Sequence, residues 1–364
     1  MNPNLKKLHA LGQSLWVDNI TRQMLGDGTM QRYIDEFSVT GLTSNPTIFE
    51  HAIGAGDLYD EQIAELSRQG RSGEDLFFEL ALRDLRQAAD LFRPAFDATR
   101  GVDGWVSLEV SPAIVDDTAR TIAAAAKLHA AAARPNLYIK IPGTPAGVKA
   151  IEESIFAGVP INVTLLFSCE QYLASAEAYV RAIERRIAAG LDPKVESVAS
   201  LFVSRWDVAV KDEVPAEWRN RLGIAISKRT YKAYRDLLAS PRWKKLASAG
   251  ARPQRLLWAS TGTKDPAAPD TLYLEALAAP DTVNTIPDKT LKAFAEHGKV
   301  GAPLADDGGD AEAVIAQFRK LGVDDAALAS RLQKEGAASF QKSWDSLLAG
   351  LKDKTSQLDG ASAR

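Results

Sequence analysis

The chain has 364 residues, of which 46% are hydrophobic and 25% are charged, as is typical of a soluble globular enzyme with a large core. Its formal net charge of −3 lacks the basic excess of a nucleic-acid-binding surface, so no nucleic-acid partner is expected. It has one cysteine and four scattered histidines, so neither an internal disulfide, a metal site nor another cofactor is expected.

The N-terminus lacks the apolar segment of a signal peptide, and no apolar run approaches the roughly 18 residues of a membrane span. The single Cys169 favours a reducing compartment. We therefore expect a cytoplasmic protein without a membrane partner.

Eight short segments have the composition of buried strands, and segments with helical periodicity separate them. In chain order these strands are expected at Ser14–Ile20, Val39–Asn45, Trp105–Val110, Asn136–Pro142, Ile161–Phe167, Ser197–Val203, Arg255–Thr261 and Asp281–Pro287. Strands that alternate with long helices pair in parallel, and eight such units close a (β/α)8 TIM barrel. An open doubly wound sheet is the alternative, but the glycine-rich phosphate turn that it needs after the first strand is absent from the sequence TRQMLGDG.

Helix starts are indicated at several junctions. A hydroxyl N-cap followed by proline occurs at Ser111 and Thr144, and Ser168 with Gln171 predicts a capping box. Asp288 is expected to cap the helix after the eighth strand.

The chain is expected to form one domain, residues 1–364, a barrel with additional N-terminal and C-terminal helices. From about residue 310 the sequence predicts two or three amphipathic helices that pack on the barrel, with the last ten residues frayed.

Alternation along each strand separates the side chains that face the helices from those that point inward. In NLYIKIPGT, Ile139 and Ile141 face the helices and Lys140 points inward. Other polar or aromatic side chains on the inner face or at its ends are Asp18, Asn45, Glu109, Asn162, Thr164, Ser200 and Phe202. Taken singly, Lys140 could be an edge-strand lysine or a structural ion-pair partner of Glu109. A barrel core is normally apolar, so the coincidence of these groups near the strand ends predicts a site.

A desolvated lysine forms a Schiff base with a carbonyl, and nearby carboxylates can move the protons, without a metal. Arg205 follows the sixth strand, Ser260 lies at the end of the seventh, and Lys264 is four residues further on. Such barrels often bind phosphate near their last strands, so a sugar phosphate is the expected substrate. Lys264 could instead be a solvated loop lysine. Two other functions stay open: a glycosidase that uses Asp18 and Glu109, which leaves Lys140 unexplained, and a sugar-phosphate-binding barrel without turnover.

The blocks GLTSNPTIF, VSLEVSP, NLYIKIPGTPAGVKAIEE, GVPINVTLLFS, VASLFVSRWD and LLWASTGTKDP resemble transaldolases of the longer bacterial and plant-like group, in order and over nearly the whole chain. The resemblance implies a (β/α)8 barrel and a cofactor-free transferase of the pentose phosphate pathway, monomeric or homodimeric. A dihydroxyacetone unit would pass from sedoheptulose 7-phosphate to glyceraldehyde 3-phosphate, giving erythrose 4-phosphate and fructose 6-phosphate.

The resemblance also implies roles for single residues. Lys140 matches the Schiff-base lysine, Asp18 the acceptor of the C4 hydroxyl proton, and Glu109 with Thr164 the pair that holds the catalytic water. The substrate-binding positions that match are Asn45 and Asn162 for the dihydroxyacetone hydroxyls, with Ser200 beside them, and Arg205 and Ser260 for phosphate.

The sequence departs from the family pattern at one phosphate contact. Many transaldolases have Ser-x-Arg at the seventh strand, whereas this chain has Ser260-Thr261-Gly262, and Lys264 is expected to replace the arginine. The similar but shorter fructose 6-phosphate aldolases have tyrosine where this chain has Phe202. A phenyl ring cannot protonate the retained carbanion, which favours transfer over cleavage.

Overall fold

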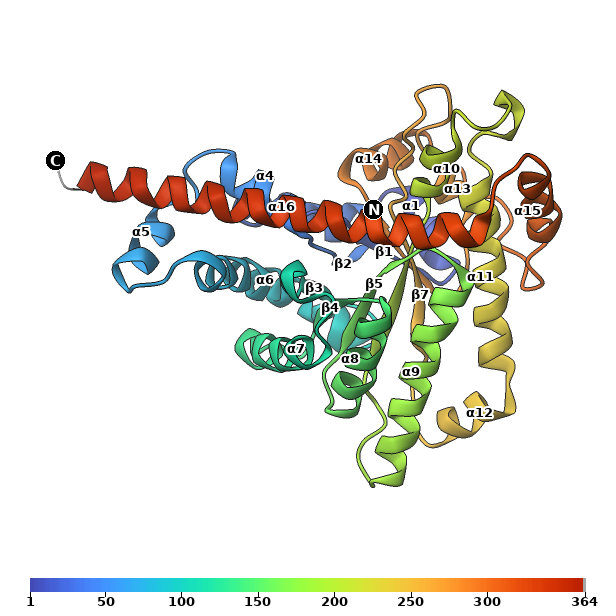
Figure 1. The fold of residues 1–364 in the computed structure, drawn as a ribbon, viewed down its shortest axis with the longest axis horizontal. Coiled ribbons are helices and arrows are strands. Elements are labelled where there is room, and N and C mark those ends of the chain that lie inside the picture. Colours follow the sequence, from blue (N-terminus) through green and yellow to red (C-terminus); the bar gives the residue numbers. More distant parts are fainter. Residues whose placement is uncertain (363–364) are drawn as a thin grey trace.

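The computed structural model describes residues 1–362, and within them eight parallel strands form a barrel surrounded by helices (Figure 1). The strands are β1 (Gln13–Val17), β2 (Val39–Leu42), β3 (Val106–Glu109), β4 (Leu137–Pro142), β5 (Ile161–Leu166), β6 (Ser197–Phe202), β7 (Arg255–Ala259) and β8 (Thr282–Ile286). The expected (β/α)8 barrel is confirmed.

The strand order, β2-β1-β8-β7-β6-β5-β4-β3, brings the two end strands together. Leu42 N donates to Trp105 O at 3.0 Å, and Ser44 Oγ donates to Ser107 O at 2.7 Å. Gly41 permits this approach, since a Cβ there would lie 2.5 Å from Trp105 O. The open doubly wound alternative is therefore wrong.

The helices follow the strands in the expected alternation, with short additional helices. They are α1 (Pro3–Ala10), α2 (Arg22–Gly26), α3 (Thr29–Phe37), α4 (Pro46–Gly54), α5 (Asp60–Arg68), α6 (Gly73–Ala98), α7 (Thr118–Ala132), α8 (Pro145–Phe156), α9 (Cys169–Ala188), α10 (Ser204–Val210), α11 (Leu222–Ala239), α12 (Pro241–Ser248), α13 (Leu272–Ala276), α14 (Asp288–His297), α15 (Ala311–Lys320) and α16 (Asp325–Ser362), with 3₁₀ turns η1 (Pro112–Ile114) and η2 (Ala216–Trp218).

Two of the expected helix starts are confirmed. Thr144 Oγ1 accepts the Gly147 amide at 3.1 Å at the start of α8. Ser168 and Gln171 form the capping box of α9, with both reciprocal hydrogen bonds present. These caps fix the entry into the helices that follow β4 and β5.

The expected cap at Ser111 is confirmed for the short 3₁₀ helix η1, where Ser111 Oγ accepts the Ala113 amide at 3.3 Å. The long helix α7 begins later, where the Asp117 carboxylate accepts the Arg120 amide at 2.9 Å. The expected cap at Asp288 is wrong. Asp288 is the first residue of α14 rather than its cap. Its carboxylate is occupied by Tyr33 Oη and by Lys292 Nζ, so it does not turn back to the helix amides.

The barrel interior has an apolar floor beneath a polar end. The floor consists of Trp16, Trp105, Tyr138, Val198, Leu257, Ala259 and Val283. Trp105 and Tyr138 stack with ring centroids 4.0 Å apart. Leu15, Ile139 and Ile141 instead join the larger core between strands and helices, as alternation predicts. Polar residues follow the floor residues along the strands, so any site lies at the C-terminal ends.

The C-terminal segment forms two helices, α15 and α16, and α16 runs across the molecule to the neighbourhood of α4 and α5 (Figure 1). The expected fraying is wrong for residues 355–362, which belong to α16, and residues 363 and 364 lie outside the part of the chain that the structure describes. Leu351 is buried, Leu358 packs on the core, and Lys354 pairs with Asp60 at 2.7 Å. These three contacts hold this end of the helix on the protein. The single-domain assignment stays a prediction.

Within residues 1–362, no helix is both long enough and apolar enough to cross a membrane.

Candidate active site

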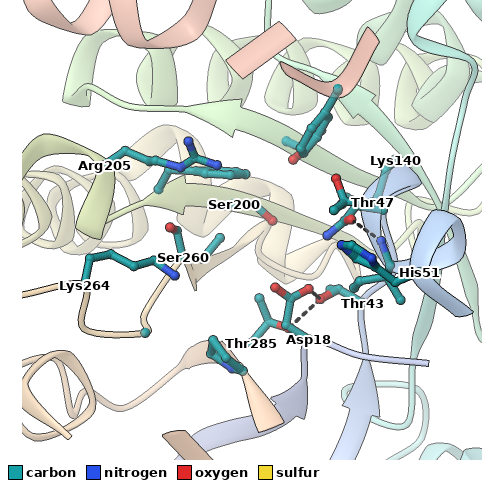
Figure 2. Close-up of a pocket in the computed structure, with 18 residues that line it drawn as sticks. Asp18, Thr43, Thr47, His51, Lys140, Ser200, Arg205, Ser260, Lys264 and Thr285 are labelled. Carbon is teal, nitrogen blue, oxygen red and sulfur yellow. Dashed lines mark hydrogen bonds between the residues drawn. The ribbon is translucent and has the colours of Figure 1, made fainter. Parts of the chain in front are cut away.

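A cavity of about 320 Å³ opens at the C-terminal ends of the strands (Figure 2). Its lining residues are Asp18, Thr43, Asn45, Thr47, Ile48, His51, Lys140, Thr164, Ser200, Phe202, Arg205, Ala259, Ser260, Gly262, Lys264, Thr285, Pro287 and Phe340. The structure therefore brings together the candidate residues that the sequence predicts. Two of them, Glu109 and Asn162, do not line the cavity but contact residues that do: Glu109 pairs with Lys140, and Asn162 accepts a hydrogen bond from Ser200.

Lys140 lies deep in this cavity. Its Nζ donates to Ser44 O at 2.9 Å and lies 3.2 Å from Glu109 Oε2. Both side chains are nearly buried, with 6% and 5% of their surfaces exposed. The two residues are direct neighbours in the β3–β4 register, and β4 pairs with strands on both sides, so the edge-strand alternative is wrong.

The Glu109 carboxyl experiences two opposing effects. Burial raises its pKa above the ordinary value, and the neighbouring Lys140 charge lowers it in part, with a net increase. A carboxyl in this state holds a proton more readily than a solvated glutamate. It can therefore serve as a proton donor and acceptor within reach of the Lys140 amine.

Asp18 follows the end of β1 and faces the cavity. Burial raises its pKa, while the Lys140 charge and a 2.8 Å hydrogen bond from Thr43 Oγ1 lower it in part. The Thr43 and Thr285 hydroxyls lie 2.5 Å apart. This arrangement orients a carboxyl with raised proton affinity toward the space in front of Lys140.

A polar row lies beside Lys140 on the next strands. Asn162 is the register neighbour of Lys140 on β5. Its Nδ2 donates to Ser107 Oγ at 3.1 Å and its Oδ1 accepts Ser200 Oγ at 2.7 Å. Thr164 Oγ1 is buried and has no hydrogen-bond partner among residues 1–362. That hydroxyl is available to a water or substrate.

Asn45 lies at the opposite wall, at the first residues of α4. Its Oδ1 accepts the Ile48 amide at 3.0 Å, so the side chain caps α4. The cap fixes the side chain next to the cavity. Its place results from the helix start rather than from strand alternation, since β2 already ends at Leu42.

Cationic and hydroxyl groups lie together at one side of the cavity, away from Lys140 (Figure 2). Arg205 is in the first turn of α10, Lys264 is in the loop after β7, and both are exposed at the rim. Ser260 has a left-handed backbone, φ 57°, and its Oγ lies 2.8 Å from Ser204 Oγ. Lys264 is an exposed loop lysine that also lines the cavity, and its role as a phosphate contact stays a prediction.

Sequence reasoning missed several lining residues. Thr285 follows from strand alternation on β8, and Thr43 directly follows β2, where its amide still donates to Val17 O at 3.0 Å. Thr47 and His51 are one turn apart on α4 and follow only once that helix is known to border the cavity. Phe340 could not be found this way, because it depends on how α16 packs.

No group of three or more metal-ligating side chains occurs in the part of the chain that the structure describes.

Comparison with known proteins identifies the family. Residues 15–351 match the model of a family described as transaldolase/fructose-6-phosphate aldolase. The chain belongs to this family. It is 44% identical over 362 residues to a transaldolase of Parafrankia sp. (strain EAN1pec), covering 97% of this chain and 98% of that protein.

Other relatives agree. The chain is 43% identical to transaldolases of Thiobacillus denitrificans, covering 94% of this chain and 98% of that protein, and of Thermobifida fusca, covering 96% and 97%. Membership of the transaldolase/fructose-6-phosphate aldolase family confirms the resemblance and the expectation of an enzyme that transfers aldehyde or ketone groups. The glycosidase alternative is set aside.

Proposed function

We propose that the protein is a transaldolase that transfers a dihydroxyacetone unit between sugar phosphates through a Schiff base on Lys140. The observation that supports this most is the buried Lys140 amine, 3.2 Å from Glu109, at the base of a cavity with cationic groups at one side. The names of the relatives agree with this activity.

The first step forms the bond between enzyme and donor. Lys140 Nζ attacks the C2 carbonyl of the ketose phosphate and gives a carbinolamine, whose hydroxyl leaves as water when Glu109 supplies a proton. The raised pKa of Glu109 suits this donor role. The Thr164 hydroxyl would hold the water that leaves and later returns for hydrolysis of the iminium.

The second step breaks the C3–C4 bond. Asp18 accepts the proton of the C4 hydroxyl while the bonding electrons pass into the iminium, which becomes an enamine, and the aldose phosphate leaves. The enamine then attacks the aldehyde carbon of the acceptor, and Asp18 returns its proton to the new alkoxide. The raised pKa of Asp18 supports both directions of this transfer.

Substrate recognition divides along the cavity. The amide and hydroxyl groups of Asn45, Asn162 and Ser200 would bind the hydroxyls of the dihydroxyacetone unit. Arg205, Ser260 and Lys264 would bind the phosphate. Phe202 presents a ring without a proton donor, which favours transfer over release of the three-carbon unit.

The same proposal includes the substrates, sedoheptulose 7-phosphate and glyceraldehyde 3-phosphate, and the products, fructose 6-phosphate and erythrose 4-phosphate. It also includes a role in the pentose phosphate pathway, a cytoplasmic location and a monomeric or homodimeric state. They are what the family resemblance implies.

The test is chemical trapping of the adduct. Wild-type protein is incubated with fructose 6-phosphate and borohydride, digested, and searched by mass spectrometry for a three-carbon adduct on the peptide that contains Lys140. We expect the adduct in wild type and in Lys149→Met, which removes an exposed lysine of α8, and none in Lys140→Met.

Turnover with erythrose 4-phosphate as acceptor, but with no adduct at Lys140, would contradict the proposed mechanism. Tight binding of sugar phosphates without exchange of carbon would instead support a binding barrel without turnover.

A further inference from the structure

One face of α16 lies on the C-terminal end of the barrel. Gln333, Gly336, Phe340 and Ser343 are spaced by three or four residues, so they share this face. Phe340 lines the cavity, and Ser343 Oγ lies 2.8 Å from Thr47 Oγ1, another lining residue. The helix is therefore part of the cavity wall.

Gln333 contacts the ends of two catalytic strands at once. Its Nε2 donates to Gly143 O at 3.1 Å and to Leu165 O at 3.0 Å. Gly143 follows β4, which provides Lys140, and Leu165 directly follows Thr164 on β5. One side-chain amide thus links the two strand ends that bear these residues.

The backbone at Leu165 is irregular. Its φ is 57°, a conformation that costs a residue with a Cβ on the order of 1–3 kcal/mol. The β5–β6 register shifts between Val163 and Leu166. The Leu165 side chain turns out of the barrel and packs against α16, where a Cβ on Gly336 would lie 2.9 Å from Leu165 Cδ2.

Thr164 is held through its backbone. Its carbonyl accepts the Gly143 amide at 2.7 Å, while its hydroxyl has no partner within residues 1–362. The direction of that hydroxyl therefore depends on the peptides on either side. The carbonyl of the Thr164–Leu165 peptide accepts the Gly143 amide, and Gln333 fixes the carbonyls of Gly143 and Leu165 on either side of this hydrogen bond.

We propose that Gln333 is a positioning residue of the active site, which holds the irregular end of β5 so that the Thr164 hydroxyl faces Lys140 and Glu109. This inference depends on the proposed function, since it assigns Gln333 to the water-handling step of Schiff-base formation. It makes the C-terminal helix a necessary part of the catalytic site.

The test compares three variants of the full chain. Gln333→Met removes both donors, Gln333→Glu replaces the amide by a carboxyl of similar shape, and Gln341→Met removes a glutamine from a solvent-exposed hydrogen bond of the same helix. For both Gln333 variants at pH 8 we expect kcat and the rate of borohydride-trapped adduct formation to fall by about 10- to 100-fold, with KM changed less than about twofold. Gln341→Met should match wild type.

A pH series separates positioning from general damage. As the pH falls from 8 to 5.5, Gln333→Glu gains a proton that can restore one donor, so its kcat relative to wild type should rise, while that of Gln333→Met stays low. The two replacements differ in polarity, so they disturb folding in different ways. If one variant does not fold, the other can still be compared with wild type.

The outcomes distinguish the two proposals. Suppose that wild type forms the adduct at Lys140 and the Gln333 variants keep wild-type kcat, with or without a higher KM. The proposed role of Gln333 is then wrong, and the proposed function stands. If wild type forms no adduct, the proposed function itself fails.

Discussion

At the scale of single residues, Phe202 is the side chain that best distinguishes transfer from cleavage. Its ring lines the cavity and packs on Phe167 with centroids 5.3 Å apart. We expect Phe202→Tyr to place a hydroxyl where it can protonate the retained carbanion. Release of dihydroxyacetone from fructose 6-phosphate should then rise at least about tenfold relative to transfer, within the range of general acid catalysis.

The measurement compares dihydroxyacetone release without acceptor with carbon transfer to erythrose 4-phosphate. Phe202→Leu is the matched control, because it changes the shape of the wall without adding a donor. An equal rise in both variants, or an unchanged ratio in Phe202→Tyr, would show that the ring's missing hydroxyl does not determine the partition.

The candidate site was predictable from sequence to the extent that strand geometry positions it. Lys140 and Glu109 follow from alternation, since a two-residue period fixes which face a side chain occupies. The same rule also places Thr43 and Thr285 on the inner face, but it does not indicate that a threonine belongs to the site. His51 and the other residues on helices depend on packing between distant segments, which local periodicity does not encode.

At the scale of elements, Asp207 joins three helices near the expected phosphate contacts. It belongs to α10, accepts the Leu222 and Gly223 amides at the start of α11 at 2.9 and 3.2 Å, and accepts Tyr273 Oη of α13 at 2.7 Å. Burial raises its pKa to about 6, and these hydrogen bonds lower it in part. Arg205 precedes it on the same helix.

The sign of the pH effect follows from the raised pKa. Between about pH 4 and 6 the folded state binds a proton at Asp207 that the unfolded state has lost, so this group makes the free energy of unfolding fall as pH rises. Asp207→Asn, which keeps an acceptor for the two amides, should remove that fall. We measure the free energy of unfolding by urea denaturation. From pH 4.5 to pH 7, its value in Asp207→Asn minus its value in wild type should increase by about 1–3 kcal/mol.

Asp207→Ala is the control, because it leaves the amides at the start of α11 without their acceptor. It should lose about 1–3 kcal/mol at either pH. A difference between Asp207→Asn and wild type that does not change with pH would contradict the raised pKa.

All eight strands were predictable because alternating strand and helix composition repeats at each unit. Some strands were predicted to continue too far. The second strand was expected to end at Asn45, but β2 ends at Leu42, and the residues that follow are not assigned to a strand. The break at Leu165 was not predictable, since leucine has no preference for the left-handed region and the partner of its carbonyl, Gln333, is distant in the sequence. The length of α16 was also missed, because its last turns depend on Lys354 and other tertiary contacts.

At the scale of the whole molecule, the charge at the cavity rim is opposite in sign to the net charge of the chain. The chain has a formal net charge of −3, yet Arg205 and Lys264 lie exposed at the rim of a cavity whose base contains Lys140. These two cations attract an anion to the rim although the molecule as a whole is negative. Such attraction between exposed charges weakens as salt shortens the screening length to about 3 Å at 1 M.

We therefore expect KM for fructose 6-phosphate to rise several-fold from low to high salt, while kcat, which depends on the buried Lys140–Glu109 pair, changes little. Lys264→Met should raise KM for a phosphorylated acceptor by about tenfold, equivalent to about 1.4 kcal/mol, and weaken the salt dependence. With glyceraldehyde, which has no phosphate, the same variant should resemble wild type. Lys149→Met removes an exposed lysine outside the cavity and should leave both KM values unchanged. If Lys264→Met affects the phosphorylated and unphosphorylated acceptors equally, Lys264 does not replace the missing arginine as a phosphate contact.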